Sequence, residues 1–114
     1  MLTIYHNPRC SKSRQTLALL EDKGLQPNIV EYLNTPPTTQ ELADILGKLE
    51  MAPRDLMRTK EDIYKDLNLS DPALSDAQLI QAMVDNPILI ERPIVVHNHQ
   101  AALGRPPEQV LDIL

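Results

Sequence analysis

The stretch YHNPRCSKSR, residues 5–14, contains the only cysteine of the chain, and basic side chains surround it. Arg9, Lys12 and Arg14 flank Cys10, whereas the first 20 residues contain no Asp or Glu. This opening stretch therefore carries a charge of +3, against −8 for the rest of a chain whose net charge is −5. Because the thiolate is the reactive form of cysteine and neighbouring cations favour it, the pattern predicts a nucleophilic thiol at Cys10.

Each residue near the thiol also has a purely structural interpretation. Cys10 could be a small buried apolar residue, as free cysteines often are. His6 could add positive charge near the sulfur, or it could end a strand and hydrogen-bond a backbone carbonyl. Ser13 and Arg14 could be ordinary first-turn residues or hydrogen-bond donors beside the thiolate. We favour the functional interpretation of Cys10 because its neighbours are charged and polar rather than aliphatic.

The spacing around Cys10 excludes two familiar thiol motifs. A disulfide oxidoreductase would carry Cys-x-x-Cys, but Ser13 occupies the third position after Cys10. A phosphatase-type loop would need an arginine where the chain has Thr16. A single cysteine also cannot form an internal disulfide, which fits a reducing cytoplasm. Any electrons for a redox reaction must therefore come from outside the chain.

The length, net charge and composition of the chain limit the classes of partner. The chain has 114 residues, enough for one core of leucine, isoleucine and valine, and we expect one domain over residues 1–114. A net charge of −5 argues against a nucleic-acid partner, because such binding depends on neutralising phosphates. No apolar run approaches the roughly 18 residues that span a bilayer, and no secretory signal is recognisable, so we expect a cytoplasmic protein without a membrane partner. The cysteine and histidine spacings match no zinc site, so we expect no metal and no bound cofactor.

The elements that position Cys10 form a βαβ unit. Residues 2–5 alternate in polarity like a strand, and Asn7-Pro8 then predicts a turn. Residues 11–23 predict a buried helix that ends at Gly24, and residues 29–33 predict a second strand, parallel to the first. Cys10 then lies between a strand and the start of a helix, where unpaired N–H groups and the helix dipole favour the thiolate.

The rest of the chain predicts helices followed by a ββα segment. Capping-box spacings at Thr38/Glu41 and Ser75/Gln78 each precede an amphipathic helix, and residues 50–74 predict only short helical pieces. Residues 94–96 and 101–103 predict an antiparallel hairpin around a polar turn at 97–99. Two prolines at 106–107 then predict a last helix, whose apolar residues are Val110, Leu111 and Leu114. The order is that of an α/β, thioredoxin-like fold (βαβ plus ββα) with a helical insert at about 38–86.

Four ordered motifs extend over essentially the whole chain: YHNPxCxxSR at 5–14, YLxxPP at 32–37, ERPIVV at 91–96 and GRPPEQVLDIL at 104–114. They resemble the motifs of the glutaredoxin-linked arsenate reductase family. The resemblance implies an enzyme with a thioredoxin-like fold, in which the thiolate attacks arsenate and forms a cysteine–arsenic ester. Glutathione, as co-substrate, and glutaredoxin then complete the reduction to arsenite.

The resemblance also implies the residues that bind the oxyanion. The three arginines of the family match Arg58, Arg92 and Arg105, and its histidine matches His6. Planar guanidinium groups suit bidentate contact with a tetrahedral oxyanion such as arsenate. From the residues alone, each arginine is better explained as a surface group paired with a carboxylate such as Glu91 or Glu108, and Arg54 keeps that interpretation.

The fold implies a cis peptide bond at Pro93, beside the cysteine. The chain departs from the family pattern next to the thiol: arsenate reductases of the family carry a small residue before the cysteine and Gly-Thr after it, whereas this chain has Arg9 and Ser11-Lys12. Two alternatives stay open. One is a non-enzymatic regulator or adaptor similar to the Spx proteins, which bind RNA polymerase, and the other is a monothiol reductase similar to glutaredoxin.

Overall fold

The computed structural model describes all 114 residues, which form two compact units. We call residues 1–35 with 92–114 the sheet unit, and residues 36–91 the helical unit. The helical unit is slightly longer than the insert predicted at about 38–86. The expectation of a single domain over residues 1–114 stays a prediction.

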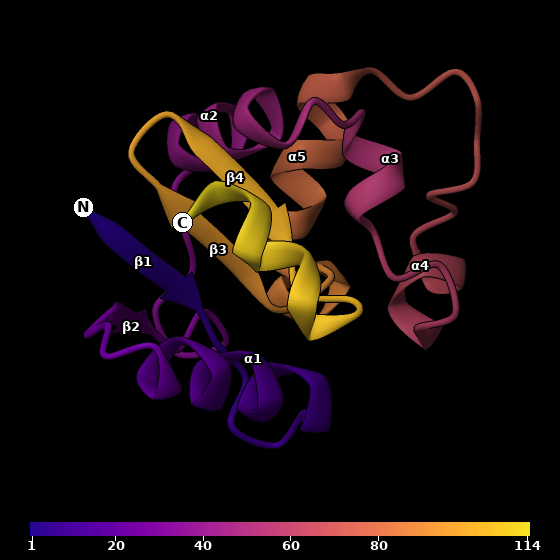
Figure 1. The fold of residues 1–114 in the computed structure, drawn as a ribbon. Coiled ribbons are helices and arrows are strands. Elements are labelled where there is room, and N and C mark those ends of the chain that lie inside the picture. The colour runs from indigo at the N-terminus through magenta and orange to yellow at the C-terminus, as the bar shows by residue number, and fades with distance from the viewer. The chain divides into compact units, whose positions relative to one another are not determined.

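The sheet unit contains a four-stranded sheet with the order β2-β1-β3-β4 (Figure 1). Strands β1 and β2 are parallel, as the βαβ prediction requires, whereas β3 is antiparallel to both β1 and β4. The elements of this unit are β1 (Leu2–Tyr5), α1 (Ser11–Asp22), β2 (Asn28–Val30), β3 (Ile94–His97), β4 (Gln100–Leu103) and η2 (Pro107–Ile113). The hairpin prediction is confirmed, except that His97 belongs to β3 and only residues 98–99 form the turn.

The register brings three chain segments to one edge of the sheet. Tyr5, Ile94 and Leu103 lie in one row across β1, β3 and β4. The row contains the last residue of β1, the first of β3 and the last of β4. The segments that follow Tyr5, precede Ile94 and follow Leu103 therefore all leave the sheet at the same edge.

The core of the sheet unit lies on the face covered by α1 and η2. Its buried side chains are aliphatic: Ile4, Leu20, Val95, Val110 and Ile113. In Figure 1, η2 is the yellow C-terminal segment, and it packs against β4 and α1. Cys10 is not a member of this aliphatic cluster.

The C-terminal segment differs from the helix predicted for it. It is a 3-10 helix, and its buried side chains are Val110 and Ile113, three residues apart. Of the apolar residues that the sequence placed on this helix, Val110 is buried, whereas Leu111 and Leu114 are 36% and 39% exposed. The reason is the period: with three residues per turn, residues i and i+3 share one face, so Ile113 is buried with Val110.

The helical unit contains α2 (Thr39–Leu49), α3 (Pro53–Leu56), α4 (Asp62–Asp66), α5 (Asp76–Asp85) and the 3-10 turn η1 (Pro87–Leu89). Both predicted capping boxes are present: the Thr38 and Ser75 hydroxyls accept the N–H of Glu41 and Gln78, whose side chains accept in return. The prediction of short helical pieces between α2 and α5 is also confirmed. No helix of the structure combines the length and the apolar character needed to cross a membrane.

Candidate active site

Cys10 is the residue immediately before α1 and has extended backbone angles. Its N–H donates to the Asn7 carbonyl at 3.0 Å, and its carbonyl accepts the N–H of Arg14 at 3.0 Å. The thiol is 8% exposed and is not hydrogen-bonded to the first-turn N–H groups as a cap. Cys10 thus lies between β1 and the start of α1, and this part of the prediction is confirmed.

His6 and Ser13 form a buried pair beside the turn that leads to Cys10. The His6 Nδ1 and Ser13 Oγ atoms are 2.6 Å apart, and Ser13 Oγ also accepts the N–H of Asn7 at 3.0 Å. This oxygen therefore links the start of α1 to the end of β1. One interpretation of the sequence gave the His6 ring a backbone carbonyl as its hydrogen-bond partner. In the structure the partner of Nδ1 is the Ser13 hydroxyl instead.

Burial lowers the pKa of His6, and Arg14 lowers it further, while Glu31 acts in the opposite direction. His6 is thus biased toward the neutral form near neutral pH. Of the two interpretations of His6, the one in which it adds positive charge beside the sulfur is therefore not favoured. The sequence could not reveal this, because the decisive factor is the burial of His6, which is 6% exposed.

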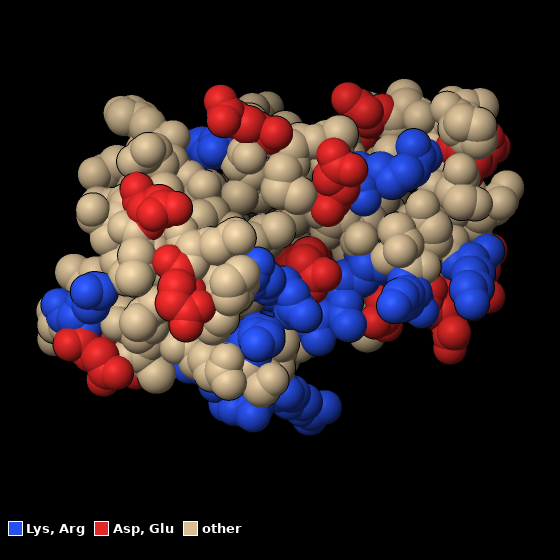
Figure 2. All heavy atoms as spheres, turned by 45° about the vertical axis from the view of Figure 1, so that its right-hand side comes forward, with Lys and Arg blue, Asp and Glu red and all other residues tan.

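The cations near Cys10 differ in their environments. Arg9 is exposed, and its backbone N–H donates to Asn7 Oδ1 at 3.0 Å. Arg14 is also exposed, and its Nη1 donates to the Pro8 carbonyl at 3.0 Å, which ties the turn to the first turn of α1. Figure 2 shows Lys and Arg (blue) and Asp and Glu (red) exposed on the same face, so the excess of acid does not give a uniformly acidic surface.

Arg92 and Arg105 lie just outside the strands, at the same edge of the sheet as the turn before Cys10. Arg92 is two residues before Ile94, and Arg105 is two residues after Leu103, its partner in the register. Arg105 Nη1 donates to the Arg92 carbonyl at 3.1 Å, so the structure brings these two predicted residues together. The peptide bond after each arginine is cis: the bond at Pro93 was implied by the fold, and the bond at Pro106 was not foreseen.

Arg58 belongs to the helical unit. Its N–H donates to the Leu89 carbonyl at 2.7 Å, and its Nη2 lies 3.2 Å from Glu61 Oε2, an ion pair in which both side chains are about a quarter exposed (26% and 25%). Its membership of a common oxyanion site with Cys10 stays a prediction. Arg54, which was set aside from the site, donates from Nη2 to the carbonyls of Leu69 and Asp71 and so fastens a loop.

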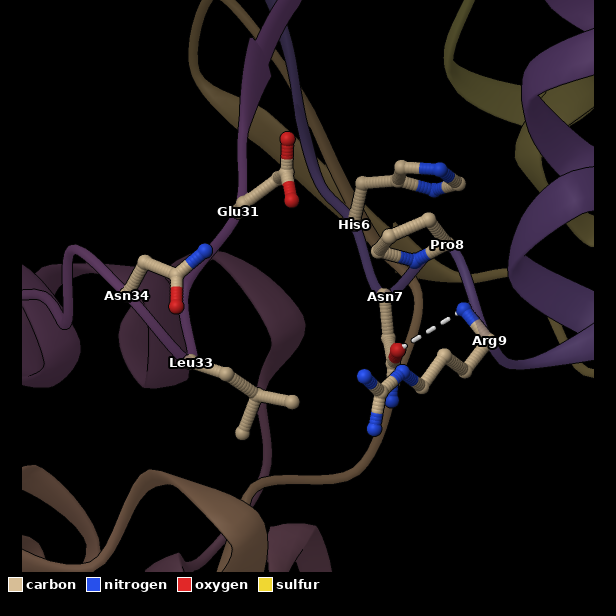
Figure 3. A pocket seen from close by; sticks show the side chains of 7 residues that line it. All are labelled: His6, Asn7, Pro8, Arg9, Glu31, Leu33 and Asn34. Atoms are coloured by element: carbon tan, nitrogen blue, oxygen red, sulfur yellow. Dashed lines mark hydrogen bonds between the residues drawn. The ribbon is translucent and has the colours of Figure 1, made fainter.

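A pocket of about 300 Å³ lies beside the turn before Cys10 (Figure 3). It is lined by His6, Asn7, Pro8, Arg9, Glu31, Leu33 and Asn34. The sequence analysis did not single out Asn7 as a site residue, nor the segment 31–34. The second strand was predicted at residues 29–33, whereas β2 ends at Val30, so the prediction placed most of this segment inside the strand and not at the edge where the strand ends.

The fold and the thiol define a class of protein. It is a thioredoxin-like protein whose single cysteine precedes the first helix of a βαβ unit. The profile of the ArsC family matches residues 5–113. The chain therefore belongs to the ArsC family, and both the resemblance drawn from its motifs and the predicted fold class are confirmed.

Relatives of the chain extend over nearly its whole length. It is 62% identical over 112 residues to "Uncharacterized protein YfgD" of Escherichia coli K12, covering 97% of this chain and 94% of that protein. It is 54% identical over 112 residues to an arsenate reductase of Haemophilus influenzae, covering 97% of each. The structure of an arsenate reductase from Vibrio cholerae matches with a TM-score of 0.97 at 56% identity, over 99% of this chain and 97% of the other.

Proposed function

We propose that this protein is an enzyme that reduces arsenate to arsenite, with Cys10 as the nucleophile and with glutathione and glutaredoxin as electron donors. The observation that carries the proposal is the position of Cys10 immediately before α1, in a chain of the ArsC family with relatives named arsenate reductase. Reduced thiols are abundant in the cytoplasm, where we expect the protein to act.

The reaction balances without a cofactor. The Cys10 thiolate attacks arsenic and forms an S–As bond, while one oxygen of arsenate leaves as water after protonation. Arsenic is still pentavalent in this ester. Two external thiols then supply two electrons and become one disulfide, which releases arsenite and restores the cysteine. External donors are required because Cys10 is the only cysteine.

Three arginines would hold the oxyanion during the attack. Arsenate and the thiolate are both anionic, so their repulsion has to be offset before the sulfur can reach arsenic. We assign this role to Arg58, Arg92 and Arg105. The hydrogen bond from Arg105 to the Arg92 carbonyl supports a joint role for these two, since it holds one guanidinium against the segment that carries the other.

His6, Ser13 and Arg14 would tune the thiol through the shape of its turn. The buried His6–Ser13 pair and the Arg14–Pro8 hydrogen bond both connect the segment before Cys10 to the first turn of α1. A neutral histidine holds Ser13 without adding charge, so the positive potential at the sulfur is assigned to the helix terminus and to the arginine and lysine side chains.

The test is arsenate-dependent oxidation of glutathione, coupled through glutaredoxin. Wild type should be active with arsenate, and Cys10→Ser should be inactive. Arsenate should also slow alkylation of Cys10 at pH about 6.5, and Arg92→Ala should weaken this protection while the matched Lys23→Ala should not. Alkylation that no tetrahedral oxyanion slows, together with no arsenate-dependent oxidation, would contradict the proposal.

The same samples distinguish the alternatives. Reduction of protein–glutathione mixed disulfides without any oxyanion, and without dependence on Arg92, would indicate a monothiol reductase. Capture of RNA polymerase by a protein that lacks both activities would indicate a regulator or adaptor.

A further inference from the structure

The pocket beside Cys10 is built from two segments at one edge of the sheet. Residues 6–9 follow β1, and residues 31–34 follow β2. The parallel pairing of these strands, with Tyr5 opposite Val30, brings the two segments together, and the N–H of His6 donates to the Val30 carbonyl at 2.8 Å. Both walls are therefore fixed by the sheet.

The two walls present opposite charges. Figure 3 shows the Glu31 carboxylate and the Asn34 amide reaching into the space from one segment, and the Arg9 guanidinium reaching into it from the other. Neither Glu31 nor Arg9 is in an ion pair with another residue. Leu33, from the same segment as Glu31, adds an apolar surface to the pocket. This arrangement suits a small group that carries both an ammonium and a carboxylate.

The size and position of the pocket limit the ligand. A volume of about 300 Å³ is at the small end of ligand sites, so it holds one end of a tripeptide and not the whole of it. Arg9 is next to Cys10 in the chain, and consecutive Cα atoms are about 3.8 Å apart. The thiol of such a tripeptide is on its second residue, and two extended residues span roughly 7 Å, so the first residue can occupy the pocket while the thiol reaches the turn of Cys10.

We propose that this pocket binds the amino-acid end of a γ-glutamyl thiol, with its α-ammonium on Glu31 and its α-carboxylate toward Arg9. This inference rests on the proposed function, which requires an external thiol to act at Cys10. It adds a binding site and a reason for selecting a γ-glutamyl thiol over a simple thiol. Among the lining residues Glu31 has no role at the thiol in the proposed function, so Glu31→Gln tests recognition of the co-substrate separately from recognition of the oxyanion.

The test is a double-mutant-style cycle, in which the affinities of two ligands are compared for wild type and for Glu31→Gln. S-methylglutathione has no free thiol, and its N-acetylated form lacks the ammonium. Both are titrated into ¹⁵N-labelled protein, and amide shifts are measured. Acetylation should weaken binding to wild type about tenfold, the effect of one charge-assisted hydrogen bond, and should weaken binding to Glu31→Gln less than about twofold. Glu21→Gln makes the same change at the exposed end of α1 and should behave like wild type.

Arg9 is tested by the same titrations. Arg9→Gln should weaken both ligands by about the same factor, roughly fivefold or more, whereas Lys23→Gln should change neither. Equal losses on acetylation in wild type and Glu31→Gln would overturn the proposal, as would absence of binding by wild type or shifts confined to residues outside 6–9 and 31–34.

Failure of this inference can be distinguished from failure of the proposed function. If wild type oxidises glutathione in an arsenate-dependent reaction but the titration cycle shows no role for Glu31, only the pocket assignment is wrong. If the cycle behaves as expected and no oxyanion is reduced, the pocket assignment holds and the proposed reaction is wrong.

Discussion

At the scale of single residues, the environment of Cys10 depends on one buried hydroxyl. Ser13 Oγ accepts the N–H of Asn7 and lies 2.6 Å from His6 Nδ1. A buried polar atom that loses such partners costs about 1–3 kcal/mol, so this oxygen stabilises the turn as well as the histidine. Ser13 stands where a second cysteine would be needed for an internal disulfide, and it stabilises the turn before Cys10.

The low pKa of His6 predicts a dependence of stability on pH. In the unfolded chain the histidine has its ordinary pKa of about 6.5, whereas burial lowers the pKa in the folded protein. At a pH between these two pKa values the unfolded chain binds more protons than the folded protein. The contribution of His6 to the free energy of unfolding is therefore fully present above about pH 6.5 and is lost as the pH falls through the lower pKa of the folded protein. The free energy of unfolding should therefore decrease from pH about 7.5 to about 5 in part because of His6.

The measurement is urea unfolding across this pH range for wild type and His6→Asn, whose amide can keep a contact with Ser13. The variant should be less stable at neutral pH and should lose less stability on acidification. The exposed His99→Asn is the matched control and should follow wild type. Parallel curves for wild type and His6→Asn would show that His6 titrates alike in the folded and unfolded chains.

At the scale of elements, α1 is held against the hairpin through a glycine. A Cβ atom at Gly104 would overlap the Thr16 hydroxyl and lie 2.7 Å from Pro93 Cγ. The Gly104 N–H also donates to the Pro93 carbonyl at 3.0 Å, so the backbone cannot easily shift. This close approach brings the segment of Arg92 and Arg105 against the helix that begins after Cys10.

Gly104→Ala should therefore destabilise the protein by about 1–3 kcal/mol, because the added methyl group overpacks a tight contact. Gly47→Ala is the matched control: no atom lies within 4 Å of its Cβ position in α2, and alanine is the better helix former, so it should stabilise by about 0.5–1 kcal/mol. Urea unfolding measures both. Equal effects of the two substitutions would mean that Gly104 is not in close contact with α1.

Elements with local signals were predictable, and elements set by tertiary packing were not. The capping boxes at Thr38 and Ser75 involve residues three apart in sequence, so the spacing alone identified both helices. The C-terminal 3-10 helix was read as α-helical because its prolines and apolar residues suit either form, and packing against the sheet selected the i, i+3 face. The contact of Gly104 with Thr16 joins residues 88 positions apart, which no local pattern records.

At the scale of the whole molecule, the candidate site combines residues from distant parts of the sequence. Cys10 and its basic neighbours could be singled out because they are contiguous. Arg92 and Arg105 could be selected only through the resemblance, since the residues alone favoured surface ion pairs, and the sheet register then explains why these two meet. Glu31 lines the pocket through the pairing of β2 with β1, so it was not identifiable from local spacing, and the role of Arg58, which belongs to the helical unit, stays a prediction from the resemblance.

The last prediction concerns the balance between net and local charge. The chain has a net charge of −5, which repels anions at long range, whereas Arg9, Lys12 and Arg14 add +3 near the thiol. The rates at which Cys10 reacts with anionic iodoacetate and neutral iodoacetamide report the potential at the sulfur. We expect the iodoacetate to iodoacetamide ratio to exceed that of a free cysteine peptide at low ionic strength, because Arg9, Lys12 and Arg14 are near Cys10 in the chain and a Debye length of about 30 Å at 0.01 M salt leaves their charges unscreened.

Raising the salt to about 0.5 M shortens the screening length to a few ångströms, so the ratio should fall toward that of the free peptide. The double variant Arg9→Gln, Lys12→Gln should lower the ratio at low salt and leave it nearly independent of salt, while Lys23→Gln, Lys48→Gln removes the same charge elsewhere and should not. A ratio that rises with salt would mean that the net negative charge controls the potential at Cys10, and an oxyanion would then reach the thiol against repulsion at every distance.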